Sequence, residues 1–324
     1  MNRDRRITRE ELKAAVNAAY TSLKDNREGR NADYIPYLAN VDSQLFGIAV
    51  CLPGGETITV GDSNYQFGIE SISKVATAIL VLKEYGAETL LDMIGADATG
   101  MPFNSVLAIL LENEHPSTPL VNAGAISAVS MVRPVGNSRG KWEAILKNMN
   151  ELCGSELPLI DELYKSESAS NHNNRAIAWL LKSYERIYDE PELSLDLYTR
   201  QCSLGVTARE LSTMAATIAC SGYNPVTKRT VFQPMLTEKI TSMIATVGMY
   251  EHSGNWMFSC GIPAKSGVGG GIIGVLPGIF GIAAFSPPID KAGNSVKAQL
   301  AMRYIMEQLR LNIFSGERVV IVEY

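Results

Sequence analysis

Hydrophobic positions follow a helical period over most of this chain and a strand-like pattern near its two ends. Thr8 and Glu11 have the spacing of a capping box, which predicts that an amphipathic helix begins there and spans residues 8–25. The apolar stripe of that helix would consist of Leu12, Ala15, Val16, Ala19 and Leu23.

Two pairs of short apolar runs predict antiparallel strands. Residues 45–52 and 57–60 flank a turn at Pro53-Gly54-Gly55, which is typical of a hairpin. Near the other end of the chain, residues 270–275 and 281–285 flank a turn at Pro277-Gly278. Strands from both ends of the chain therefore contribute to the fold.

Between these strands the pattern is mostly helical. Residues 71–85 are apolar nearly all round and stop at Gly86, which is typical of a helix buried in a core. Further helices are expected over residues 141–152, 175–188, 208–220 and 294–314.

This order predicts an α+β fold, in which one antiparallel sheet is built from both chain ends, with flanking helices and a helical insertion. We expect one unit over residues 1–324. Its sheet-containing part would be residues 1–70 and 225–324, and residues 71–224 would be mainly helical.

Composition excludes several classes of protein. The net charge of −5 and the absence of a long basic run argue against a nucleic-acid-binding surface. Because no run of about 18 apolar residues or secretory signal is visible, we expect no membrane association and a cytoplasmic location. Five scattered cysteines and three separated histidines favour reduced thiols over a zinc site, and no cofactor is expected.

Two short motifs suggest a chemistry. Ser71-Ile72-Ser73-Lys74 matches S-x-x-K, and Lys265-Ser266-Gly267 matches K-[ST]-G, as in serine enzymes that acylate and then hydrolyse amides. A serine hydroxyl needs a base, and a lysine three positions along a helix lies on the same face. The apolar neighbours of Lys74 would lower its pKa toward that of a general base.

Each motif also has a purely structural explanation. S-x-x-K occurs a second time at Ser138-Arg139-Gly140-Lys141, in a polar stretch typical of a surface loop, and Ser71 would equally serve as a helix N-cap beside an exposed Lys74. Around Lys265-Ser266-Gly267, glycines would serve tight packing, or would let a backbone N–H join that of Ser71 in an oxyanion hole.

Longer segments around these motifs resemble the serine-dependent glutaminases, which are related to the β-lactamases and penicillin-binding proteins. The resemblance covers roughly residues 33–296. It is carried, in order, by residues 33–39, 70–75, 119–126, 197–203, 247–250, 263–268, 286–290 and 293–295. One departure is His172-Asn173-Asn174-Arg175, where the family usually has Asp-Arg-Asn-Arg.

The resemblance implies a role for each matching residue. Ser71 would be the nucleophile, Lys74 its base and Tyr250 a proton carrier, and the backbone N–H groups of Ser71 and Val268 would form the oxyanion hole. Together with these groups, the substrate L-glutamine would be held by Tyr34, Asn122, Glu167, Asn174 and Tyr198. It further implies a β-lactamase or DD-peptidase-like fold and a homodimer or homotetramer.

The chemistry of these side chains agrees with a small zwitterionic substrate, since an acid suits an ammonium group and neutral donors suit a carboxylate and an amide. Considered singly, Asn122 would be a turn or cap residue, Glu167 an exposed glutamate, and the tyrosines core aromatics. The leading hypothesis is an L-glutaminase that forms a serine acyl-enzyme. The alternatives are a β-lactam or peptidoglycan-type acyltransferase and a catalytically silent glutamine-binding protein.

Overall fold

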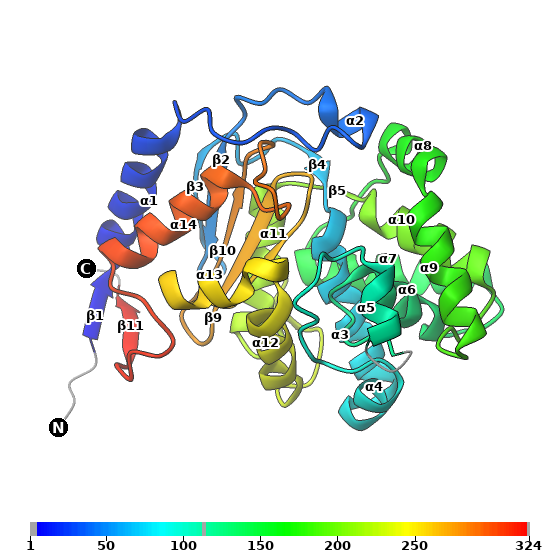
Figure 1. The fold of residues 1–324 in the computed structure, drawn as a ribbon. Coiled ribbons are helices and arrows are strands. Elements are labelled where there is room, and N and C mark those ends of the chain that lie inside the picture. The colour runs from blue at the N-terminus through cyan, green and yellow to red at the C-terminus, as the bar shows by residue number, and fades with distance from the viewer. Residues whose placement is uncertain (1–4, 112–114, 323–324) are drawn as a thin grey trace.

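The centre of the protein is a five-stranded antiparallel sheet, seen in a computed structural model that describes residues 5–111 and 115–322 (Figure 1). The strand order is β3-β2-β10-β9-β8. The bounds are β2 Gly47–Cys51, β3 Thr57–Gly61, β8 Ala264–Ser266, β9 Gly271–Leu276 and β10 Phe280–Phe285. Strands from the two ends of the sequence thus pair directly, β2 with β10, which confirms the prediction of one sheet from both ends.

Both faces of the inner strands are covered, so their sequences are continuously apolar. Ile48 and Val50 of β2 point into one core, whereas Ala49 between them points into the other. The first core lies under helices α1 (Arg9–Leu23) and α14 (Val296–Gln308), and the second lies under α11 (Ala208–Ala219) (Figure 1). Gly281 lets α11 approach β10 closely, since a Cβ there would lie 2.0 Å from the backbone nitrogen of Ala216.

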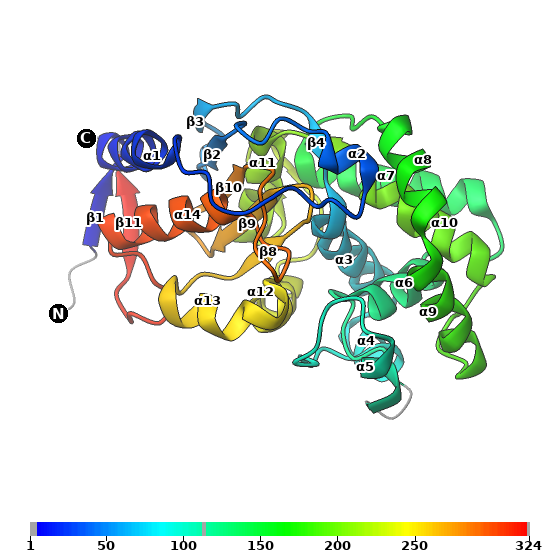
Figure 2. The same ribbon diagram turned by 45° about the horizontal axis from the view of Figure 1, so that its top comes forward.

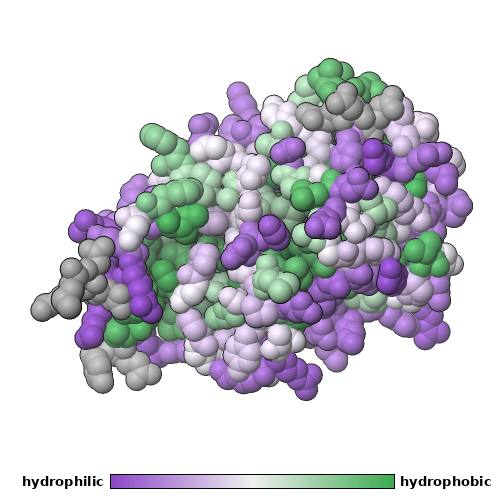
Figure 3. All heavy atoms as spheres, turned by 90° about the horizontal axis from the view of Figure 1, so that it is seen from below, coloured by the Kyte–Doolittle hydropathy of each residue, from purple (hydrophilic) through white to green (hydrophobic). Residues whose placement is uncertain are grey.

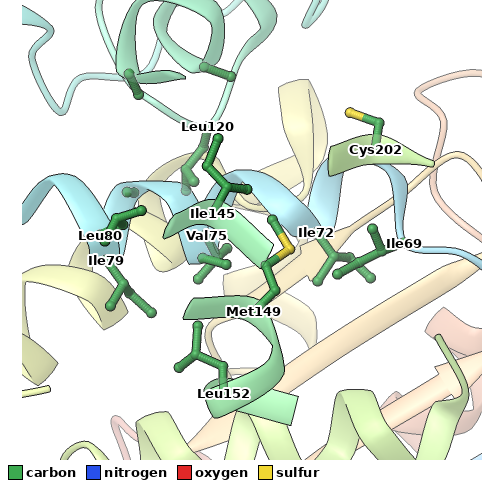
Figure 4. Packing of buried hydrophobic residues seen from close by; sticks show 14 of the residues in the cluster. Ile69, Ile72, Val75, Ile79, Leu80, Leu120, Ile145, Met149, Leu152 and Cys202 are labelled. Carbon is green, nitrogen blue, oxygen red and sulfur yellow. The ribbon is translucent and has the colours of Figure 1, made fainter. Parts of the chain in front are cut away.

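A helical region extends from one side of the sheet and is built mainly between β4 and β5 (Figure 2). Its helices are α3 Ser73–Tyr85, α4 Ala87–Met93, α5 Val106–Leu111, α6 Asn122–Met131, α7 Ser138–Cys153, α8 Asp161–Ser170, α9 His172–Ser183 and α10 Pro191–Cys202. Every residue of α3 from Ser73 to Leu82 is buried, as its apolar sequence predicts. Val75 and Ile79 of this helix belong to the same core as Ile145 and Met149 of α7 (Figure 4).

Smaller elements complete the fold. Two-stranded pairs are formed by β1 (Arg5–Thr8) with β11 (Val319–Val322), by β4 (Phe67–Gly68) with β5 (Gly205–Val206), and by β6 (Tyr223–Asn224) with β7 (Arg229–Thr230). The remaining helices are α2 Pro36–Ala39, α12 Leu236–Val247 and α13 Ser253–Ser259, with single 3-10 turns at Glu70–Ile72 and Tyr250–His252.

The predicted helices are confirmed, but several ends differ. The capping box at Thr8 is present, and its helix ends at Leu23. The helix expected over 175–188 is α9 and ends at Ser183, because Glu185 turns the chain with a positive φ of 59°. The helix expected over 294–314 ends at Gln308.

The second S-x-x-K match is not in a surface loop, and that prediction is wrong. Asn137 caps α7, so Ser138 is its first residue. Lys141 is fully buried, where its Nζ lies 2.5 Å from Asp189 Oδ2 and donates to the carbonyl of Ser130 at 2.6 Å. Ser138 remains exposed, so this match is a structural ion pair beside an unrelated serine.

The surface of one face is shown in Figure 3, where hydrophilic residues are widely spread and apolar residues gather in a few places. Within residues 5–111 and 115–322, no helix is both long enough and apolar enough to cross a bilayer. All five cysteines are free.

Candidate active site

Ser71 lies on the 3-10 turn that joins β4 to α3, and Lys74 lies in the first turn of α3. Lys74 is 1% exposed, which excludes the interpretation of Lys74 as a solvated surface side chain. Its Nζ donates to Ser71 Oγ at 2.9 Å and to Asn122 Oδ1 at 2.6 Å. The spacing of the first motif thus places a serine hydroxyl and a potential base in direct contact.

Asn122 connects Lys74 to two further helices. It is the first residue of α6, and its amide nitrogen donates to Asn174 Oδ1 of α9 at 2.8 Å. The hydroxyl of Tyr198, on α10, donates to Asn122 Oδ1 at 3.2 Å. Gly124 permits this position for α6, since a Cβ there would lie 1.9 Å from the carbonyl oxygen of Thr118.

Tyr250 approaches Ser71 from the sheet-containing part of the chain. It has a positive φ of 56°, which is rare for a bulky residue and is found mostly where the surrounding structure enforces it. Its hydroxyl donates to the carbonyl of Ser266 at 3.1 Å, and its side chain lies near Ser71. Burial raises the pKa of Tyr250, so the phenol stays protonated at neutral pH.

The second motif contributes a buried lysine as well as a backbone turn. Lys265 is fully buried, donates to the carbonyl of Ser266 at 2.8 Å, and places its Nζ 4.1 Å from the centre of the Tyr250 ring. Burial and the nearby Lys74 lower the pKa of Lys265 well below its usual value. Our sequence analysis assigned this lysine no contact with Tyr250.

Val268 follows this motif in the turn between β8 and β9. Gly267 brings the turn against the Ser71 segment, since a Cβ there would lie 2.8 Å from the carbonyl oxygen of Ile69 and 3.4 Å from the backbone nitrogen of Ser71. In the described part of the chain the N–H of Val268 has no acceptor, so it is available to a ligand.

A cavity of about 220 Å³ opens beside Ser71, a size that suits a small amino acid. Tyr34 and Glu167 contribute to its wall, with Ser71, Asn122, Asn174, Tyr198 and Val268. A larger hollow of about 730 Å³ lies beside this cavity, and Tyr34, Phe103 and Asn104 line both.

The charged groups of the site have displaced pKa values. Burial lowers the pKa of Lys74 to about 8, against smaller opposing effects of Cys202, Glu70 and Glu167. Burial raises the pKa of Glu167 to about 7, although a hydrogen bond with Glu70 and the charge of Lys74 act in the opposite direction. Lys74 thus has a pKa near that of an effective general base.

All nine residues singled out from the sequence come together at this cavity or directly behind it. The interpretation of Glu167 as an exposed glutamate is wrong, since its Oε1 is buried. The sequence analysis missed Glu70, Phe103, Asn104 and Cys202, which also line the cavity. Glu70 had a signal, because it is an acid in an otherwise apolar segment directly before the nucleophile motif.

The loop that departs from the family pattern forms the start of α9. Asn173 donates to the carbonyl of Asn104 at 2.9 Å, and Asn174 keeps its contact with Asn122. His172 is exposed. Among the described residues, no group of three or more His, Cys, Asp or Glu side chains is arranged to hold a metal ion.

A buried serine–lysine pair beside a small polar cavity is an arrangement that enzymes acting by nucleophilic catalysis also use. Comparison with known proteins identifies the family: a family model described as "Glutaminase" matches residues 29–314. A glutaminase of Bacteroides fragilis is 67% identical over 320 residues, which cover 99% of this chain and 100% of that protein. The chain therefore belongs to the glutaminase family.

Solved structures agree with this assignment. One described as "Probable glutaminase ybaS" has a TM-score of 0.94 and 45% identity, with 96% of this chain and 100% of that chain covered. Another, Mglu "in its glutamate form", has a TM-score of 0.89 and 32% identity, with 95% of this chain and 70% of that chain covered.

Proposed function

We propose that this enzyme hydrolyses L-glutamine to L-glutamate and ammonia through an acyl-enzyme on Ser71. The observation that carries the mechanism is the contact of 2.9 Å between the buried Lys74 amine and Ser71 Oγ. The choice of glutamine as the substrate rests on the relatives named glutaminase and on the structure of Mglu in its glutamate form.

In the acylation step, Ser71 Oγ attacks the side-chain amide carbon of glutamine and its proton passes to Lys74. The resulting oxyanion accepts hydrogen bonds from the N–H groups of Ser71 and Val268. Two such donors matter, since the loss of one typically costs about 3 to 4 kcal/mol of barrier.

When the tetrahedral intermediate collapses, the carbon–nitrogen bond breaks and the nitrogen leaves as ammonia with the proton that Ser71 gave up. Tyr250 carries this proton from Lys74, because its protonated phenol lies between Ser71 and the turn of the second motif. Water then attacks the acyl-enzyme, Lys74 takes the proton of the water, and L-glutamate leaves with Ser71 restored.

Substrate recognition follows from the groups that line the cavity. Glu167 suits the α-ammonium group, and the neutral side chains of Tyr34, Asn122, Asn174 and Tyr198 suit the α-carboxylate and the amide. We further propose a β-lactamase-like fold, a homodimer or homotetramer and a cytoplasmic location, which rest on the family resemblance and on the sequence.

Ammonia release from L-glutamine and L-asparagine by the purified, folded protein tests this function directly. We expect hydrolysis of glutamine and much weaker hydrolysis of asparagine, whose shorter side chain would not bring its amide carbon to Ser71. No ammonia from glutamine at millimolar concentration would contradict the proposal. Covalent labelling of Ser71 by penicillin without glutamine hydrolysis would instead favour the acyltransferase.

A further inference from the structure

Glu70 is a buried acid in the wall of the cavity that the mechanism above does not use. It is 3% exposed, and its Oε1 is buried without a hydrogen-bond partner among the described residues. Glu167 Oε1 is in the same situation, and the two carboxyl groups line the same cavity and lie close enough for each to shift the pKa of the other. Two carboxyl groups from distant elements therefore meet where a ligand would enter.

The backbone around Glu70 is built to hold this carboxyl group in place. Glu70 has a positive φ of 50°, a conformation that costs free energy for a residue with a side chain. Three glycines pack against it, and a Cβ on Gly68, Gly267 or Gly269 would lie 3.3 Å, 3.2 Å or 3.1 Å from its side chain respectively. Much of the glycine-rich turn after β8 thus accommodates Glu70.

Burial outweighs the charge of Lys74, which favours ionisation of both carboxyl groups. Lys74 directs its amine at Ser71 and Asn122, and the other titratable groups that face the pair are Tyr34, Tyr198, Cys202 and Tyr250. Burial raises the pKa of each of these four groups, so all of them are neutral at pH 7.

Two carboxylates cannot both be ionised at hydrogen-bonding distance without a proton or a cation between them. Burial and the Glu167 carboxyl group raise the pKa of Glu70 well above its usual value, so Glu70 is the protonated partner and donates to Glu167. The empty site therefore holds a proton where a cationic group of a ligand would fit.

We propose that Glu70 and Glu167 together form the ammonium-binding site of this enzyme, which shares one proton when empty and releases it when the substrate α-ammonium group enters. This inference rests on the proposed function. The released proton passes to solvent, and the ammonium group then donates to both carboxylates. An analogue that lacks the α-amino group, such as glutaramate, leaves the proton in place and binds poorly.

Proton release on binding can be counted by calorimetric titration of the enzyme with L-glutamate at pH 8, in two buffers that differ in ionisation enthalpy. Wild type should release about one proton more per bound ligand than Glu70→Gln, since at pH 8 Glu167 is largely ionised and Glu70 still holds its proton. The glutamine of the variant keeps a hydrogen-bond donor toward Glu167 but has no proton to lose, and any contribution of Lys74 is common to both enzymes.

Kinetics provide the second readout. Glu70→Gln should raise KM for glutamine about tenfold or more, the effect of losing one charge-assisted hydrogen bond, while kcat changes less. The matched control is Glu162→Gln, an exposed glutamate on the same helix as Glu167, which should leave KM and the proton count unchanged. Circular dichroism confirms that each variant is folded.

Two outcomes would contradict the proposal that Glu70 and Glu167 form the ammonium-binding site. One is an equal proton count for wild type and Glu70→Gln, and the other is an unchanged KM. If Glu70→Gln does not fold, wild type titrated with glutarate, which lacks the α-amino group of L-glutamate, gives the same test, because the proton should then stay on the pair. A wild-type enzyme that releases no ammonia from glutamine would contradict the proposed function instead, so the two failures are distinguishable.

Discussion

Lys74 shows how environment turns an ordinary residue into a candidate catalytic base. A solvated lysine is protonated at neutral pH and has no electron pair to offer. Burial in α3 lowers the pKa of Lys74 to about 8, and the amine is held between Ser71 and Asn122. Burial acts on Tyr250 in the opposite sense, since it keeps the phenol protonated.

The pH profile of kcat/KM should follow from these shifts. Lys74 is an effective base only above its pKa, so kcat/KM for glutamine should rise with pH and level off above about pH 8. Because burial raises the pKa of Tyr250, loss of the phenol proton should not lower kcat/KM below about pH 9.5. Initial rates of ammonia release from pH 5.5 to 9.5 measure this profile, and a flat profile would exclude Lys74 as the base.

At the scale of single elements, the two S-x-x-K matches have different surroundings: one lies at the candidate active site, and the other stabilises the fold. In α3, the lysine contacts a serine at a cavity. In α7, the lysine forms a buried ion pair with Asp189, and the exposed serine of the match takes no part in it. The motif alone does not distinguish these cases, because the partner Asp189 lies 48 positions further along the chain.

Lys141→Met should therefore reduce stability and leave kcat of the folded enzyme unchanged. Removing one partner of a buried ion pair typically costs about 3 to 5 kcal/mol, because the other charge remains buried. Arg139→Ala is the matched control on the same helix, where the ion pair with Glu143 is exposed and the expected loss is within about 0.5 kcal/mol. Urea unfolding measures both, and equal midpoints for the two variants would contradict this account.

The turn after β8 offers a second prediction at the scale of an element. A Cβ on Gly267 would lie 2.8 Å from the carbonyl oxygen of Ile69, so Gly267→Ala should push Val268 away from Ser71. We expect kcat to fall at least about 100-fold, as when one oxyanion donor is removed. Gly54→Ala is the control, because nothing lies within 4 Å of its added Cβ. A Gly267→Ala variant with more than half of wild-type activity would argue against this oxyanion hole.

At the scale of the whole molecule, the site forms only when the chain ends and the insertion come together. Ser71 and Lys74 lie at the start of the helical region, whereas Tyr250 lies between α12 and α13 and Val268 lies between β8 and β9. The inner strands of the sheet, buried on both faces, provide a rigid support for these groups. The division into a sheet-containing and a mainly helical part remains a prediction.

Much of this architecture could be predicted because local patterns determine it. Local patterns predict strands at the short apolar runs 45–52 and 281–285. They also predict a buried helix from residue 71, where the apolar run is longer. The family resemblance added the substrate residues, which no local pattern indicates.

The remaining features depend on contacts between distant parts of the chain. The pairing of β1 with β11 joins residues more than 300 positions apart, and Glu167 interacts with Glu70, which lies 97 positions earlier in the chain. The segment around Ser138 was expected to be a loop, but it begins α7, because Asn137 caps the helix and Lys141 pairs with the buried Asp189.

The most direct test of the central claim is kcat for glutamine hydrolysis by Ser71→Ala beside Ser138→Ala. The account predicts that Ser71→Ala loses at least about 1,000-fold in kcat, as expected for removal of a nucleophile, while it stays folded and still binds L-glutamate. Ser138→Ala, which changes the serine of the second S-x-x-K match, should retain wild-type kcat. A Ser71→Ala enzyme that keeps a tenth or more of the wild-type kcat would contradict the account.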